Sequence, residues 1–240
     1  MGSLTNRHPD ALAVVRDQHA ILDDFASYTD AQLWTKLAAD TNTVVAHEGA
    51  GAGKSRLKLT TGDATDNNES SVSSTNAVFG YLASRELSAE ALVQYTEAAT
   101  SAANVLFGFG NSFGANAIAD NGGAIAETDA AVIFKKDGDS VWSFHTEINN
   151  SSTATASTTT AGGSTAQKLR IVAKPTSSTK FEVRPYVNDV QLVDTNGVPI
   201  RHVITLGTAT DMKVGLYLKA GSANTETLYC DYIYAVVDRA

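Results

Sequence analysis

The sequence predicts an all-β fold in which two antiparallel sheets pack face to face as a sandwich. Three runs in the last third of the chain carry this prediction, because apolar and polar residues alternate in each of them. Side chains alternate across a pleated strand, so each run is a strand with one buried and one solvent-exposed face. Antiparallel strands of this kind form sheets that pack through their apolar faces. The apolar residues of the three runs are Phe181, Val183, Pro185 and Val187; Met212, Val214, Leu216 and Leu218; and Leu228, Cys230, Tyr232, Tyr234 and Val236.

Further strands follow from short apolar runs that are bounded by turn residues. Asp137-Gly138 is typical of a hairpin turn between the strands on either side of it, and Asn188-Asp189 predicts a second tight turn. The chain offers enough strands for one sandwich and has no internal repeat. The predicted strands are Leu33–Leu37, Thr43–His47, Arg56–Thr60, Ala77–Ala83, Ala91–Glu97, Val105–Phe109, Val132–Lys136, Val141–Glu147, Leu169–Lys174, Phe181–Val187, Val190–Val193, His202–Leu206, Met212–Lys219 and Thr227–Val237.

Three stretches are expected to be loops. Residues 62–74 are polar and predict a long surface loop. Residues 111–128 are rich in Gly, Ala and Asn, and we expect them to cross one end of the sandwich. Residues 149–165 consist mostly of Ser, Thr, Ala and Gly, a composition that predicts a flexible segment.

The N-terminal segment differs from the rest, because its apolar residues recur at helical spacing from Asp10 to Phe25. Pro9 and Asp10 are suitable helix-start residues. We therefore expect a helical arm over residues 1–22, followed by the sandwich over residues 23–240. Leu12, Val15 and Leu22 are the candidate protein-interface residues of this arm, although the same apolar stripe could instead cap the sandwich of its own chain.

Length and charge restrict the class of protein. The chain has 240 residues and a net charge of −8. That charge argues against nucleic acid as a partner, because phosphate binding needs a basic surface. No apolar run is long enough to span a membrane, and no signal-peptide pattern follows the start, so we expect neither a membrane partner nor export. Cys230, the single cysteine, falls on the apolar face of the last strand and is expected to be a buried thiol.

Two motifs resemble ligand sites without meeting their requirements. The run from Gly49 to Ser55 contains Gly-Lys-Ser, but Glu48 stands where a phosphate loop needs glycine, and a strand follows where a helix is required. We expect a hairpin turn there. Asp63, Asp66 and Glu69 could bind calcium, yet they lack the spacing of an EF-hand loop, and a solvated loop is favoured. The same holds for the scattered residues Asp120, Asp137 and Asp139.

The sequence also lacks the signatures of the common hydrolases. Sandwich glycanases carry paired carboxylates on one strand face, and Glu86, Glu90 and Glu97 are not spaced in that way. The histidines form no metal-ligating pair, and Trp34 and Trp142 are expected in the core. We therefore predict no catalytic residue, no cofactor and no metal. The histidines are His8, His19, His47, His145 and His202.

The order of several segments resembles the concanavalin A-like, or laminin G-like, jelly rolls found as virion proteins of tailed bacteriophages. The resemblance spans about residues 23 to 239 and implies a lectin-like sandwich with a structural place on the virion. The implied role is a capsid decoration protein, made in the host cytoplasm, whose partners are the major capsid protein and copies of itself. The segments are Leu169–Ala173, Phe181–Asp189, Val198–Pro199, Val214–Gly221, Leu228–Ile233 and Asp238–Arg239, with Phe107–Gly110 and the hairpin from Asp129 to Phe144 before them.

Two other functions stay open from the sequence. The first is a carbohydrate-binding module for host attachment, which an exposed aromatic pair on a concave face would favour. The second is a glycan-degrading enzyme, which would need two carboxylates facing each other across a groove. The calcium-ligand pattern of the sandwich lectins is not recognisable in this sequence.

Overall fold

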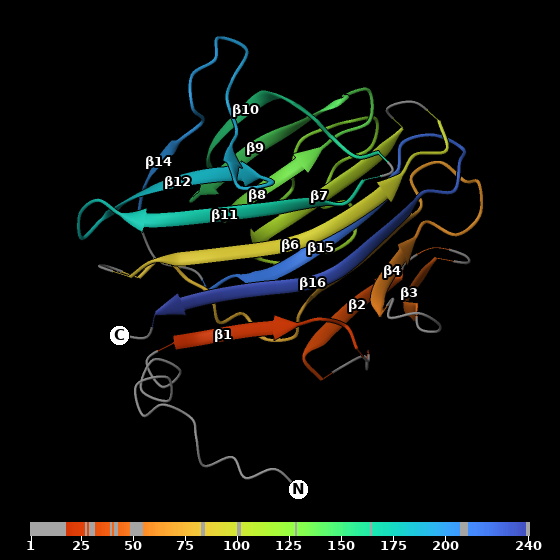
Figure 1. The fold of residues 1–240 in the computed structure, drawn as a ribbon, viewed down its shortest axis with the longest axis horizontal. Helices are drawn as coiled ribbons and strands as arrows, with labels where there is room; N and C mark the ends of the chain where they lie inside the picture. Colours follow the sequence, from red (N-terminus) through yellow and green to blue (C-terminus); the bar gives the residue numbers. More distant parts are fainter. Residues whose placement is uncertain are drawn as a thin grey trace, which may run out of the picture.

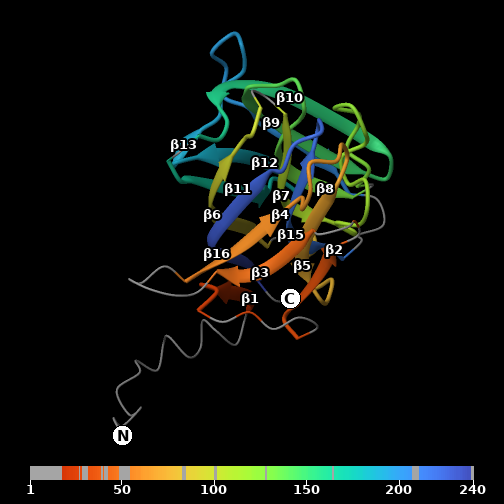
Figure 2. The same ribbon diagram turned by 90° about the vertical axis from the view of Figure 1, so that its right-hand side faces the viewer.

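The computed structural model of the protein describes residues 18–26, 28, 32–38, 40, 43–48, 55–82, 85–99, 102–127, 129–163, 165–206 and 211–238. Within these residues the chain forms sixteen strands and no helix. The strands make two antiparallel sheets that pack face to face, as Figures 1 and 2 show from two sides. The predicted all-β, two-sheet sandwich is therefore confirmed.

Sheet A has nine strands, seven of them in the order β13-β12-β11-β6-β16-β4-β3, while β1 pairs with β16 and β14 pairs with β12. β16 pairs with three strands. β6 pairs along one edge of β16, and the shorter strands β1 and β4 share the other edge. The bounds are β1 Gln18–Asp23, β3 Val44–Glu48, β4 Arg56–Thr60, β6 Leu87–Thr96, β11 Gln167–Pro175, β12 Lys180–Val187, β13 Val190–Gln191, β14 His202–Thr205 and β16 Thr227–Asp238.

Sheet B has seven strands in the order β10-β9-β8-β7-β15-β5-β2. Its central strand, β7, pairs with β15, which is far away in the sequence, and with β8, the next strand along the chain. The hairpin predicted around Asp137-Gly138 is formed by β8 and β9. The bounds are β2 Trp34–Ala38, β5 Glu69–Ser74, β7 Ala103–Gly110, β8 Ala130–Lys135, β9 Val141–Ile148, β10 Ser151–Thr160 and β15 Lys213–Ala220.

The main hydrophobic core lies between the two sheets. Met212, Val214, Leu216 and Leu218 are fully buried there, so the predicted phase of β15 is confirmed. Trp34, Trp142 and Cys230 are also buried, as expected. A second, smaller cluster lies on the opposite face of sheet B, beneath the segment 111–127; its members are Leu106, Phe113, Ala117, Ile118, Ala130, Val132, Phe134 and Tyr217.

The prediction of a helix from Asp10 to Phe25 is wrong over residues 18–23, which form β1 and pair with β16 from Gln18–Asp238 to Asp23–Ile233. Pairing with an open edge of β16 satisfies backbone groups that a helix would satisfy internally. The strand begins inside the segment predicted as the arm. Leu12 and Val15 lie outside the described residues. Leu22 lies on β1 with 71% of its surface exposed, so it does not cap the sandwich of its own chain, and its contact with another subunit stays a prediction.

Each of the three loop predictions fails in part, and one strand prediction also fails. Residues 69–74 form β5, and residues 151–160 form β10. Residues 77–83 form no strand among those described, and Phe79 makes only an isolated bridge to Met212. The segment 111–127 does not cross an end of the sandwich. It lies on the outer face of sheet B, where it covers the second hydrophobic cluster.

Candidate functional site

The candidate site is on the outer face of sheet B, the face turned away from sheet A. Because side chains alternate along a strand, residues such as Tyr217, Lys219 and His145 point outward while their neighbours enter the main core. The segment 111–127, called the cover loop below, lies over the part of this face formed by β5, β15, β7 and β8. The outer side chains therefore fall into two groups, those that hold the cover loop and those left open beside it.

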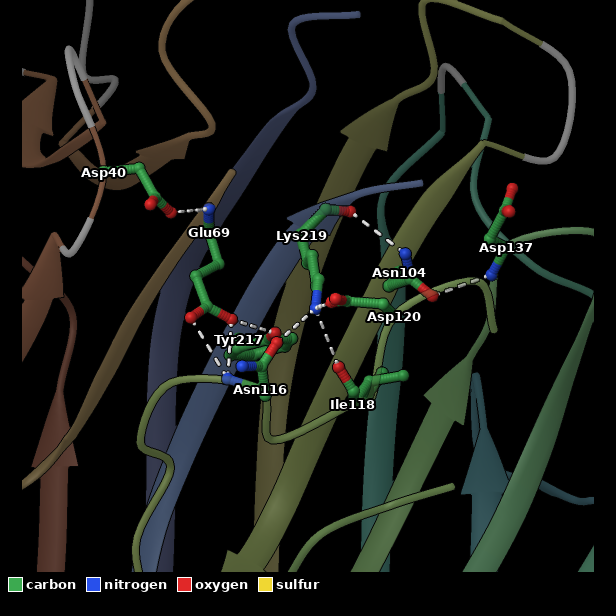
Figure 3. A network of polar contacts seen from close by, with 9 residues as sticks. All are labelled: Asp40, Glu69, Asn104, Asn116, Ile118, Asp120, Asp137, Tyr217 and Lys219. Carbon is green, nitrogen blue, oxygen red and sulfur yellow. Dashed lines mark hydrogen bonds and ion pairs between the residues drawn. The ribbon is translucent and has the colours of Figure 1, made fainter. Parts of the chain in front are cut away.

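Glu69 on β5 holds the middle of the cover loop (Figure 3). Its carboxylate accepts the backbone N–H of Asn116 at 3.1 and 2.8 Å from the two oxygens, and it accepts the hydroxyl of Tyr217. The Glu69 backbone N–H donates to Asp40 Oδ2 at 2.8 Å. Burial, followed by the bond to Glu69, raises the pKa of Tyr217 far above its ordinary value, so this phenol stays a donor. Glu69 thus serves the cover loop and is not a solvated calcium-loop residue.

Lys219 on β15 holds the same loop through its ammonium group (Figure 3). The side chain is fully buried, and Nζ donates to Asn116 Oδ1 at 2.7 Å, to the Ile118 carbonyl at 3.2 Å and to Asp120. A buried ammonium is tolerated when charged and polar acceptors surround it. Lys219 and Asp120 therefore form a structural clamp, which accounts for one of the scattered acidic residues.

The first turn of the cover loop is held by the Glu127 carboxylate and by the packing of the Phe113 ring on β15. The Glu127 carboxylate accepts the backbone N–H groups of Ser112 and Phe113 at 2.7 and 2.8 Å, and the Ser112 hydroxyl at 3.0 Å. The Phe113 ring rests on Gly215 of β15, where an added Cβ would lie 2.7 Å from the ring. The close approach requires glycine at position 215, since any side chain would push the ring away.

Beside the cover loop the outer face opens into a cavity of about 400 Å³. Its floor and walls come from β8, β9, β10 and the turn of the cover loop around Ile125. His145 and Glu147, two residues apart on β9, lie on its floor, and the distance from His145 Nε2 to Glu147 Oε2 is 3.3 Å. The lining residues are Ala124, Ile125, Phe134, Lys136, His145, Glu147, Ser152 and Ala154.

Burial controls the charges in this cavity. His145 is 6% exposed, and desolvation lowers its pKa to about 4. Desolvation, with a smaller contribution from the nearby Asp129 carboxylate, raises the pKa of Glu147. At neutral pH the imidazole is therefore uncharged, and its contact with Glu147 is not an ion pair. Within the described part of the chain, His145 Nε2 has no aligned hydrogen-bond partner.

A second buried histidine lies behind the cavity and joins the two sheets. His202 on β14 has Nδ1 at 2.9 Å from Thr146 Oγ1 and Nε2 at 3.0 Å from Thr155 Oγ1. Burial, followed by the proximity of His145, lowers its pKa to about 4. Both ring nitrogens of His202 are used within the protein, so it is a structural residue and His145 is the one that faces the cavity.

The structure separates the other candidate acids. Asp63 binds the Asn68 amide at 2.7 Å, and Asp66 is exposed, so neither joins Glu69. Glu86, Glu90 and Glu97 have different partners, namely Lys174, the Tyr232 hydroxyl and Lys135. Of the glycine-rich run at 49–55 only Ser55 is described, and the strand predicted after that run, β4, is confirmed. No group of His, Cys, Asp and Glu among the described residues is arranged to hold a metal ion.

Sequence reasoning missed the His145–Glu147 pair, because it sought histidine pairs at metal-ligating spacing. The available signal was the His-x-Glu spacing inside the predicted strand Val141–Glu147, which places both side chains on one face. In the residues that the structure describes, no helix is long and apolar enough to cross a membrane.

No protein-family model matches the sequence, and no curated protein matches it. Solved structures do share the fold. A protein of unknown function from Shewanella oneidensis MR-1 has a TM-score of 0.58 at 13% identity, covering 99% of this chain and 97% of that chain. The Emp47p carbohydrate recognition domain has a TM-score of 0.56 at 10% identity, covering 92% and 95%. An endo-1,3-beta-glucanase from Streptomyces sioyaensis has a TM-score of 0.55 at 16% identity, covering 93% and 98%.

The fold is a lectin-like jelly roll of the concanavalin A type. The predicted jelly roll is therefore confirmed, and at these identities the likeness concerns the fold alone. The neighbours include both carbohydrate recognition domains and a glucanase, so the activity of this chain must be argued from its own residues.

Proposed function

We propose that the protein is a non-catalytic, lectin-like binding module that takes a sugar residue of a glycan in the His145–Glu147 cavity. The observation that carries this proposal is the His145–Glu147 pair in the cavity, where the buried Nε2 of His145 lies 3.3 Å from Glu147 Oε2 without an aligned hydrogen bond. A buried polar atom without a partner costs free energy. A ligand hydroxyl placed against the His145–Glu147 pair would supply hydrogen bonds that the two side chains do not make with each other.

The cavity suits a polyhydroxylated ligand. Its volume of about 400 Å³ lies within the range typical of small-molecule sites. The neutral imidazole exchanges hydrogen bonds with a hydroxyl, the Glu147 carboxylate accepts them, and Ser152 both donates and accepts. Ile125 and Ala154 give the apolar surface against which the C–H face of a sugar ring packs. These few converging polar groups among apolar ones are what fix a ligand's orientation.

The same residues favour binding over glycan cleavage. Hydrolysis by the common mechanism needs two carboxyl groups on either side of the glycosidic bond. Glu147 is the one carboxylate among the residues that line the cavity. Glu69 and Glu127, also on the outer face of sheet B, direct their oxygens to the cover loop. No second carboxylate among the lining residues faces Glu147 across the cavity.

Saturation-transfer NMR against a panel of soluble mono- and oligosaccharides tests the proposal. We expect at least one sugar to bind and Glu147→Gln to weaken it by about tenfold or more, because hydrogen bonds to a charged group contribute about 1.5–3 kcal/mol. Glu86→Gln makes the same change of charge outside the cavity lining and should leave binding intact. Equal binding by the two variants would place the sugar elsewhere. The absence of any bound sugar across the panel would refute the proposal.

A second candidate is the capsid decoration role that the resemblance to virion jelly rolls implies, with the major capsid protein and copies of the chain as partners. It is supported by Leu22, the member of the predicted interface set that lies on a described strand, which is 71% exposed. Large exposed apolar side chains favour protein contacts when they belong to a wider patch. Electron microscopy of the native particle tests this candidate by locating the chain on or away from the capsid surface.

A further inference from the structure

β10 is an unusually open edge of the sandwich. It forms one rim of sheet B, as Figures 1 and 2 show in green. It is ten residues long, carries no charged residue and no proline, and most of its residues are exposed. The other outermost strands described, β1, β2, β3, β13 and β14, have two to six residues. Proteins protect their sheet edges by short strands, charges, proline or β-bulges. The first part of β10, from Ser151 to Ala156, has none of these, and its register on β9 shifts only between Ala156 and Thr160.

The turn that precedes β10 determines which backbone groups face outward. Asn149 and Asn150 both have positive φ, 51° and 62°, as in a two-residue type I′ hairpin. The residues next to such a turn, Ile148 and Ser151, form a hydrogen-bonded pair, and bonded and non-bonded pairs then alternate. The N–H and C=O groups of Ser152, Ala154 and Ala156 consequently point away from β9. Beyond Ala156 the register of β10 on β9 shifts, and there the Thr158 N–H donates to the Val193 carbonyl at 3.1 Å.

We propose that a second copy of this chain pairs antiparallel with β10 about a two-fold axis at Ala154. In that register Ser152 faces Ala156 of the other copy, Ala154 faces Ala154, and every outward N–H meets an outward C=O. The bond from Thr158 to Val193 marks where the free edge ends. Sheet B then continues from one copy into the other.

The composition of β10 identifies the occupant as a second copy. The chain carries a net charge of −8, so most contacts between copies bring like charges together. The Ser, Thr and Ala residues of β10 avoid this repulsion, and their small or β-branched side chains suit a paired strand. A charged foreign peptide, by contrast, finds no counter-charge on β10. The edge contact alone is small against the roughly 1,200 Å² of a stable interface, so we expect a dimer that dissociates on dilution.

The pairing has a consequence for binding, which rests on the proposed function. Ser152 and Ala154 line the cavity with their side chains while their backbone groups face the edge. A two-fold axis perpendicular to the sheet leaves both cavities open on the same side. The dimer thus presents two sites to a multivalent glycan surface, and avidity raises binding without any new contact at either site.

Sedimentation velocity over a range of protein concentrations tests the dimer with Ala156→Pro and Ala156→Val. Proline removes an outward N–H without touching the bonds to β9, so this variant should stay monomeric with an unchanged circular dichroism spectrum. Valine keeps the donor and should dimerise like the native chain. A native chain that is monomeric throughout, or an Ala156→Pro variant that still dimerises, would overturn the proposal.

Hydrogen exchange on the native chain gives a second measurement that needs no variant. The amides of Ser152, Ala154 and Ala156 should be protected at high protein concentration and exchange rapidly on dilution. Those of Thr153 and Thr155, which are bonded to β9, should be protected in both conditions. Concentration-independent exchange at all of these amides would contradict the pairing. A monomeric Ala156→Pro variant that binds soluble sugar normally, but loses binding to a glycan-coated surface, separates the two proposals.

Discussion

We expect the protein to lose stability when the pH falls from about 6.5 to 4, because His145 and His202 are buried in the uncharged form. Both have a folded-state pKa of about 4 against an ordinary value of 6.5. Between these values the unfolded chain binds more protons than the folded chain, so stability decreases as protons are added. The contribution is fully present above pH 6.5 and is lost below about 4.

The shift of His202 corresponds to about 3 kcal/mol, at about 1.4 kcal/mol per pH unit. The raised pKa of Glu147 acts in the opposite direction, since its folded form takes up a proton more readily, and it offsets part of the loss. Desolvation of the charged imidazolium determines the direction of the His202 pKa shift. The hydrogen bonds of His202 to Thr146 and Thr155 do not determine it, because a hydroxyl oxygen can accept a hydrogen bond from either ring nitrogen.

Urea unfolding at pH 7 and pH 4.5 measures this effect. The native chain should lose about 2–4 kcal/mol between the two conditions, and His202→Gln should lose less, because glutamine does not titrate. The reasoning is refuted if His202→Gln and the native chain have the same pH dependence.

Two substitutions and one chemical modification test the packing. Leu216→Ala should cost about 2–5 kcal/mol in a denaturant melt, since the side chain is fully buried; a cost within about 0.5 kcal/mol would mean an exposed position. Gly215→Val should displace Phe113 and make the cover loop sensitive to limited proteolysis, while cleavage equal to that of the native chain would show that the ring does not depend on this glycine. Burial raises the pKa of the Cys230 thiol, so it should react with a thiol reagent only after unfolding, and rapid reaction of the folded protein would contradict its burial.

The sequence predicted the strands whose two faces differ in environment. β12 and β15 alternate between apolar and polar residues, and the structure confirms their predicted phase. The predicted phase of β16 is confirmed at Leu228 and Cys230 and is wrong beyond them, because a register shift between Cys230 and Tyr232 turns Ile233, Ala235 and Val237 into the core in place of Tyr232, Tyr234 and Val236. β5 escaped prediction because its sequence, ESSVSS, is polar although every residue is buried. Its outer serines and glutamate lie under the cover loop, and Ser71 donates to the Phe113 carbonyl at 2.8 Å. A contact with a segment so distant in sequence leaves no local pattern.

β10 escaped prediction for a different reason. Its Ser/Thr/Ala composition is typical of a flexible segment, yet threonine also has a high propensity for strands. The turn at Asn149-Asn150 favours the strand over the flexible segment, because two adjacent positive φ angles direct the chain back along β9. The helix predicted near the N-terminus failed at residues 18–23 because an open edge of β16 was available there, which the local spacing of apolar residues cannot report.

The cover loop closes one part of the outer face of sheet B and leaves the part near β9 and β10 open. Glu69, Glu127 and Lys219 use their charges to hold the cover loop, so the groups best suited to bind or cleave a ligand are already occupied over most of the face. His145 and Glu147 lie between the cover-loop turn at Ala124 and Ile125 and an uncharged edge strand. A ligand site on this face must therefore lie at the β9–β10 edge, the same edge through which a second copy of the chain would extend the sheet.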